Sequence, residues 1–277
     1  MRSIYPITVF LAFATTSAQA HAVAPVWLWA APGDAAPQIM GAQQALPTGV
    51  DPYRFDGTWT VPASPSYDTQ IDGFYIAANM STVNAAGHVV IHYLVPVCWF
   101  DQVWDGAAWI GVVDAWSCAA WHESYDVTTN TTLASEHSAP FVPRLGEGLT
   151  LEVLLHDHVV PASMTYQVSV TDTTRGITSQ QDFFLDVTGG VDLPGLPAVY
   201  QWAQTGTGAQ SCADLAGATL HTVTMQTYPQ NTNVGQANPT DLVWNPGNPT
   251  ISQSLGAACG STGVARIQAL HSFRFAF

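Results

Sequence analysis

Short apolar segments alternate with turn-forming residues along most of the chain. Segments 164–172 and 219–225 alternate apolar and polar residues strictly, which is the pattern of a strand with one buried face. Similar segments, bounded by Gly, Pro, Asn, Asp and Ser, recur to the C-terminus, and almost none has a helical period. The predicted strands are 57–62, 71–80, 88–100, 107–116, 149–158, 164–172, 181–187, 198–202, 218–227 and 265–277. The pattern predicts an all-β protein, built as an antiparallel sandwich or barrel.

The regions around these strands set the domain organisation. Residues 1–20 begin with a positive charge, continue through a short apolar run and end in Ala-Gln-Ala, which is typical of a secretory signal peptide. Residues 21–50 are rich in Ala, Pro and Gly and predict an extended arm. Residues 51–277 form a single predicted β-domain, in which 229–249 is a long surface loop.

Export and composition limit the functions to consider. We expect a secreted protein, extracellular or periplasmic, without a membrane span and monomeric. The 277 residues carry a net charge of −14 with only 6 Lys and Arg, so a nucleic-acid groove or an anionic membrane surface is an unlikely partner. At 47% hydrophobic and 9% charged, the chain is also too apolar to be disordered.

Four cysteines in an exported chain predict two disulfides. Three connectivities are possible, and we favour the pairs that are closest in sequence: Cys98 with Cys118, and Cys212 with Cys259. A metal or redox site is the weaker alternative, because no Cys-x-x-Cys pair occurs.

Several short segments resemble the eqolisins, the glutamic peptidases built on a concanavalin-like β-sandwich. The stretch 55–62 (FDGTWTVP) precedes Thr69-Gln70 and a predicted strand, as the opening strand of that family precedes its catalytic Gln. Further similar segments follow in the same order: 89–98, 146–149, 199–202 and 218–227. The resemblance implies a concanavalin-like antiparallel β-sandwich of the jelly-roll type, and a catalytic role for Gln70.

The family's catalytic Glu has no counterpart here, since Gly111 stands where that residue is expected. Asp114, Glu123 and Glu136 are the acids that could replace it, and we favour Glu136. The other interpretation is a relative without this chemistry. In the mechanism that the resemblance implies, the carboxyl takes a proton from water and returns it to the leaving amine, while the Gln amide donates to the oxyanion. The leading hypothesis is therefore a secreted, acid-acting peptidase that needs no cofactor and acts on polypeptides.

A tryptophan cluster supports a second hypothesis, a non-catalytic glycan-binding module. Trp104, Trp109, Trp116 and Trp121 lie close together in sequence, with Trp99 before them. If they share an open face, they offer stacking surfaces for sugar rings; if they alternate inward, they belong to the core.

Histidines give a third hypothesis. His156 and His158 would share one face of a regular strand, as would His88 and His92, although polar groups on half-buried strands explain both pairs without a metal. Cleavage after residue 20 would leave His21 as the N-terminus, where its amine and imidazole could bind Cu(II) as in polysaccharide monooxygenases.

Overall fold

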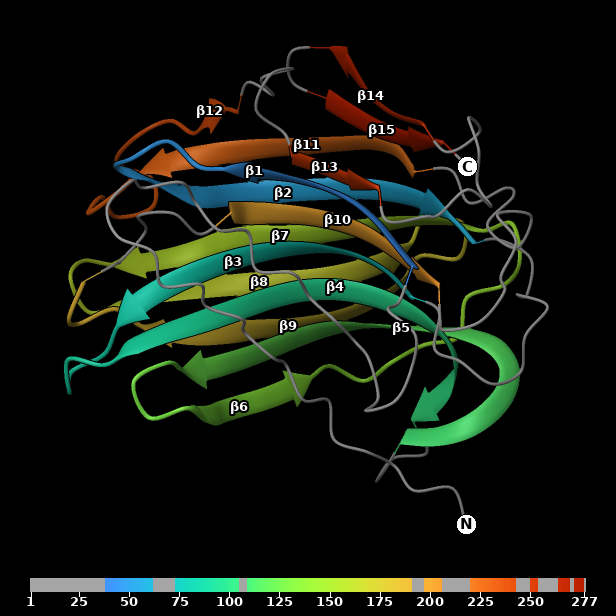
Figure 1. The fold of residues 1–277 in the computed structure, drawn as a ribbon, viewed down its shortest axis with the longest axis horizontal. Coiled ribbons are helices and arrows are strands. Elements are labelled where there is room, and N and C mark those ends of the chain that lie inside the picture. The colour runs from blue at the N-terminus through green and yellow to red at the C-terminus, as the bar shows by residue number, and fades with distance from the viewer. Residues whose placement is uncertain are drawn as a thin grey trace.

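The computed structural model describes residues 38–61, 73–104, 109–190, 197–205, 220–242, 250–253, 264–269 and 272–276. The regular elements within these ranges are β-strands, which pair in antiparallel fashion and form two sheets stacked face to face (Figure 1). The prediction of an all-β antiparallel sandwich is therefore confirmed. No helix in the described ranges is long and apolar enough to cross a membrane.

Each sheet combines strands that are distant in the sequence. The seven-stranded sheet has the order β13 (Thr250–Gln253), β1 (Gln38–Ala45), β10 (Pro197–Thr205), β3 (Gly73–Val83), β4 (Val89–Trp104), β5 (Trp109–Asp126) and β6 (Thr131–His137). The eight-stranded sheet has the order β14 (Val264–Ala269), β15 (Ser272–Ala276), β11 (Leu220–Pro229), β2 (Val50–Thr60), β7 (Gly148–Val159), β8 (Ser163–Asp172) and β9 (Ile177–Asp186), with β12 (Thr240–Asp241) paired to β11.

The core lies between the two sheets and follows from the alternation within each strand. In β8 every second residue is buried, from Met164 to Val170, as its sequence pattern predicts. In β4 and β5 the inward residues include Leu94, Cys98 and Ala120. Cys98 and Cys118 are directly opposite each other and form a disulfide within this core, as expected. Cys212 and Cys259 lie outside the described residues.

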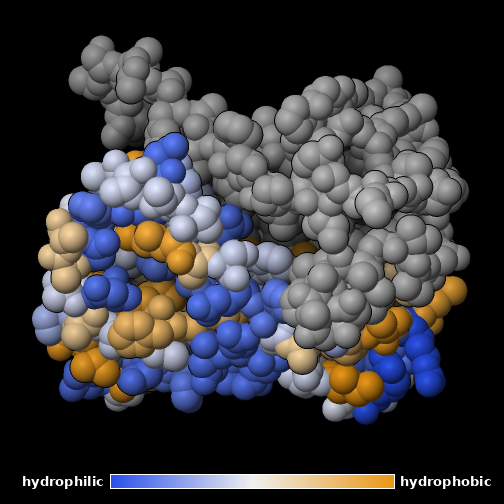
Figure 2. Space-filling view, turned by 90° about the horizontal axis from the view of Figure 1, so that it is seen from below, coloured by the Kyte–Doolittle hydropathy of each residue, from blue (hydrophilic) through white to orange (hydrophobic). Residues whose placement is uncertain are grey.

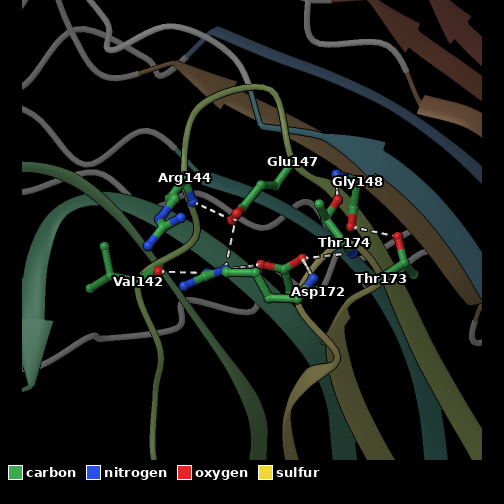
Figure 3. Close-up of polar contacts among 8 residues, drawn as sticks. Val142, Arg144, Glu147, Gly148, Asp172, Thr173 and Thr174 are labelled. Atoms are coloured by element: carbon green, nitrogen blue, oxygen red, sulfur yellow. Dashed lines mark hydrogen bonds and ion pairs between the residues drawn. The ribbon is translucent and has the colours of Figure 1, made fainter.

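An ionic cluster fixes the segment that crosses from one sheet to the other after β6 (Figure 3). The Arg175 Nε atom lies 2.6 Å from Asp172 and 3.0 Å from Glu147, and its Nη2 donates to the carbonyl of Val142 at 2.9 Å. Glu147 also accepts the backbone N–H of Arg144 at 2.6 Å. The β8–β9 turn therefore holds the middle and the end of the crossing segment.

The structure differs from the predicted strands at several places. Strand β2 begins at Val50 and not at 57, and the predicted strand 265–277 is two strands, β14 and β15, which pair with each other. Strands β12 and β13 were not predicted. Part of the predicted arm, 38–45, is strand β1, which pairs through its backbone with β10 and β13. Strand β6 was not predicted, because its side chains are mostly exposed and show no apolar alternation. Strand β5 continues ten residues past the predicted end at 116, since its buried face there carries His122, Ser124 and Asp126 instead of apolar residues.

The described surface mixes residue types. Figure 2 shows hydrophilic and hydrophobic residues side by side over the described part of one face. Large apolar side chains that are more than a third exposed lie on β6, the segment after it, β7 and β9: Leu133, Val142, Leu145, Val159, Ile177 and Phe184.

Candidate active site

A buried carboxyl group stands on the outward face of the seven-stranded sheet. Glu123 lies between His122 and Ser124 on β5, and both of these neighbours point inward with the core residues Cys118 and Ala120. Because successive side chains of a strand point to opposite faces, Glu123 points away from the core. It is nevertheless only 8% exposed. A polar acid at this level of burial on an outward face is unusual, because acidic side chains are seldom buried without a partner.

Tyr93 is the cross-strand neighbour of Glu123. The two residues are directly opposite in the β4–β5 register, and Tyr93 is 1% exposed. Burial raises the pKa of the Glu123 carboxyl to about 7, because removal from water disfavours the charged form. Burial also raises the pKa of the Tyr93 phenol, and the nearby Glu123 and Tyr125 raise it further. Glu123 therefore exchanges a proton near neutral pH, as a general acid or base requires.

Aromatic side chains flank this carboxyl along β5. Trp121 and Tyr125 lie two residues before and after Glu123, so all three share the outward face. The Trp121 ring stacks on His137 of β6, with centroids 5.4 Å apart. The His137 Nδ1 donates to the carbonyl of Ser138 at 2.9 Å, which fixes the orientation of its ring. The Tyr125 hydroxyl donates to the side-chain oxygen of Asn130 in the β5–β6 turn.

The inward face of the same two strands holds a pair of stacked histidines. His92 Nδ1 lies 3.2 Å from His122 Nε2, and His92 Nε2 lies 3.0 Å from the Thr82 hydroxyl. Burial lowers the pKa of His92 to about 3, with His122 adding to the effect, and lowers that of His122 to about 4. The pair is therefore neutral over most of the pH range. Sequence reasoning missed it, because the two residues are 30 positions apart.

The histidine pairs predicted from spacing do not form metal sites in the described structure. His156 is exposed and His158 buried, because a bulge after Leu155 places them on different sides of β7. His88 pairs with Asp126 at 2.9 Å, whereas His92 faces the interior. Searched over the described ranges, the chain has no group of three or more His, Cys, Asp or Glu placed to hold a metal ion. His21 lies outside those ranges.

The described structure does not test the favoured catalytic pair as a whole. Gln70 lies outside the described residues. Glu136 is exposed on the edge strand β6, directly opposite His122, so it stands on the other face of the sheet from Glu123. Of the two alternative acids, Glu123 has the environment of an acid/base group, while the side chain of Asp114 is not described. The alternation Trp121, Glu123, Tyr125 is the sequence signal that could have singled it out.

The predicted tryptophan platform is divided by the fold. Trp116 is a core residue, 4% exposed, and its ring meets that of Trp59 edge-on at 5.2 Å, so it does not belong to an exposed surface. Trp104 and Trp109 pair across the ends of β4 and β5, but their side chains are not described. Trp121 is the member of the set that lies half-buried on the outward face.

Comparison with known proteins gives no relative by sequence. No family model matches the chain, and no curated protein matches it. A crystal structure of scytalido-glutamic peptidase with a peptide-based transition-state analogue is similar over 87% of this chain and 98% of that chain, with 11% identity and a TM-score of 0.45. A structure of SCP-B, a member of the eqolisin family of peptidases, with the tripeptide Ala-Ile-His gives the same coverage and TM-score with 10% identity. Similarity this low supports no conclusion about activity.

Proposed function

We propose that the protein is a secreted hydrolase that acts below neutral pH and uses Glu123 as its acid/base group. The observation that carries this proposal is the buried carboxyl of Glu123 on the outward face of the sheet, with its pKa raised to about 7. Below that pH the group is protonated and can donate to a leaving group. Its conjugate base takes a proton from the attacking water as the water oxygen bonds to the carbonyl carbon and the bond to the protonated leaving group breaks, so one residue serves both steps and ends protonated again.

The bond that we propose for cleavage is an amide. A glycosidase of the usual kind needs two carboxyl groups, about 5–9.5 Å apart, around the scissile bond. Among the described side chains of β4, β5 and β6, the outward face supplies one carboxyl, that of Glu123. A single carboxyl combined with a hydrogen-bond donor for the oxyanion is sufficient for amide hydrolysis.

Gln70 is the oxyanion donor expected from the sequence resemblance, but the register favours a different residue beside Glu123. Gly73 of β3 lies three residues after Gln70 and is opposite Trp99 of β4. Trp99 is in turn opposite Ser117 of β5. Glu123 lies six residues further along β5, roughly 20 Å at about 3.3 Å per residue. Ser135, directly opposite Glu123 on β6, is the alternative donor that the register brings close.

The deciding experiment is an assay of the purified protein against denatured protein substrate from pH 2 to pH 8. We expect hydrolysis that declines as the pH rises through about 7, because the acid form of Glu123 is lost there. Glu123→Gln should lower kcat/KM by about 100-fold or more, a typical contribution of acid/base catalysis. Gln70→Ala and Ser135→Ala show which residue donates to the oxyanion.

Glu136→Gln is the matched control, because it makes the same chemical change on an exposed residue of the neighbouring strand. It should retain wild-type activity and the same pH profile. Full activity in Glu123→Gln, or no hydrolysis at any pH by the folded wild-type protein, would refute the proposal.

Glycan binding is a second candidate function, and the Trp121–His137 stack is the observation that favours it. An indole ring held in place by a second ring offers a flat surface to one face of a sugar. This function predicts a change of Trp fluorescence on adding polysaccharide, without any release of product. Trp121→Ala should abolish that change, and Glu123→Gln should leave it intact.

A further inference from the structure

A short segment closes one end of the sandwich interior. Residues 230–237, here called the strap, follow β11, and Val234 and Ala237 pack against the core. The phenol oxygen of Tyr228 lies 3.0 Å from the carbonyl oxygen of Asn233 and accepts the backbone N–H of Ala237 at 2.8 Å. The Asn233 side chain in turn accepts the N–H of Val160 at 3.0 Å. The strap is therefore held by a few hydrogen bonds that converge on one tyrosine.

Asp51 lies directly beneath the strap. It is opposite Tyr228 in the β2–β11 register and is 0% exposed. Within the described part of the chain, neither carboxyl oxygen has a hydrogen-bond partner of normal geometry. Burial raises the pKa of this carboxyl to about 7, and the nearby side chain of Gln230 in the strap opposes the shift without cancelling it. Below about pH 7 the acid is therefore mostly neutral while it is enclosed.

The groups that surround Asp51 are neutral as well. Tyr166 of β8 donates its hydroxyl to the carbonyl of Pro52 at 2.8 Å, and the proximity of Asp51 helps to raise its pKa. Tyr53 of β2 stacks on Tyr228 with centroids 5.4 Å apart.

Two basic residues lie at this end of the sandwich without balancing Asp51. His158 of β7 is 3% exposed, and its pKa is lowered mainly by burial, although a backbone hydrogen bond at Thr232 and the charge of Asp157 oppose this. Arg54 is directed to the outer surface, where it pairs with Asp56 and Glu152. An ionised Asp51 would therefore be a buried charge without a counter-ion, which is costly.

We propose that the strap is a pH-sensitive latch, in which the neutral carboxyl of Asp51 allows residues 230–237 to stay closed and its ionisation favours their release into solvent. The direction of the pH effect on strap opening follows from the difference in the Asp51 pKa between the open and closed states. In the open state the carboxyl is solvated and titrates near its ordinary pKa of about 3.9, whereas in the closed state it titrates at about 7. The opening constant therefore rises about tenfold per pH unit between these values, and is level above about 7.

Hydrogen–deuterium exchange at pH 5 and pH 7, corrected for intrinsic rates, measures the opening of the strap directly. The reporting amides are Ala237, Val160 and Gln230, whose N–H groups bond to Tyr228, Asn233 and Gly49. In the wild-type protein their protection should fall about 50-fold between the two pH values, which is half of the change that the tenfold-per-unit slope gives over two units, because the closed-state carboxyl is half ionised at pH 7. The amides of β8 should not lose protection in parallel.

Two variants isolate the carboxyl as the cause. Asp51→Asn has nearly the same shape but does not titrate, so strap protection should be equal at the two pH values. Glu123→Gln is the matched control, because Glu123 also titrates near pH 7 but lies on the other sheet. It should keep the full change of about 50-fold.

Three results would overturn the proposal: equal wild-type protection at both pH values, a pH response that persists in Asp51→Asn, or parallel loss in β8, which would mean global unfolding. Tyr228→Phe provides a test that does not depend on folding of the Asn variant. It should lower strap protection already at pH 5 while β8 stays protected, and unchanged strap protection would contradict the assigned contacts.

Discussion

Substitution of His122 tests whether a histidine buried in its neutral form makes the stability of the protein depend on pH. The side chain is 4% exposed, and burial lowers its pKa from 6.5 to about 4. We consider His122→Gln, which keeps a neutral polar side chain that does not titrate. Because the folded-state pKa lies below the unfolded value, wild-type stability from this site is complete above about 6.5 and declines as the pH falls toward about 4.

The magnitude follows from the difference in proton binding. At pH 5 the unfolded histidine lies about 1.5 units below its pKa, while the folded one is still neutral, so the wild-type protein loses about 2 kcal/mol relative to pH 7. The Gln variant lacks this loss. The variant costs some packing and hydrogen bonding at every pH, but that cost is constant, so the difference in unfolding free energy between the two proteins should shrink by about 2 kcal/mol.

Urea unfolding at pH 7 and pH 5 measures this change, and comparison of the two proteins cancels the contributions of Asp51 and Glu123. His156→Gln is the control, because the same substitution on an exposed residue of β7 leaves His122 in place, so the loss of about 2 kcal/mol between pH 7 and pH 5 should remain. If the difference between wild type and His122→Gln is the same at both pH values, the histidine is not buried in its neutral form and the reasoning fails.

Three further predictions concern stability. Arg175→Ala leaves two buried carboxylates without their cation, so the free energy of unfolding should fall by about 3–5 kcal/mol in urea titrations, with partial recovery in Arg175→Lys. Replacing both Cys98 and Cys118 by Ala should cost about 2–4 kcal/mol, and reductant should lower the melting temperature of the wild-type protein more than that of the variant. Gly189→Ala would place a Cβ 2.6 Å from the Val83 carbonyl oxygen, so a loss of about 1–3 kcal/mol is expected in thermal unfolding, and none if the loop relaxes freely.

The sequence was sufficient where one face of a strand is apolar. Strand β8 was predicted almost to its ends, because Met164, Tyr166, Val168 and Val170 point into the core and polar residues point out. The disulfide was predicted because Cys98 and Cys118 are close in sequence, and the hairpin of β4 and β5 brings them opposite each other.

The hydrophobic pattern did not predict strand segments whose buried residues are polar or whose residues are mostly exposed. The second half of β5 buries His122, Ser124 and Asp126, and β6 buries almost nothing, so neither carries the expected alternation. For the same reason the sequence left three acids open for the site. The burial of Glu123 is produced by the fold around it, which brings Tyr93 from a separate strand to its side.

Strand β5 carries a buried base and a buried acid at adjacent positions. His122 faces inward and Glu123 faces outward. Because strand side chains alternate, inserting or deleting one residue upstream would exchange the two faces, sending the carboxylate into the core and the imidazole to the surface. Both groups would then lose the surroundings that keep them neutral. Evolution along this strand should therefore proceed by substitution at constant length, and natural variants should carry their insertions in the turns at its ends.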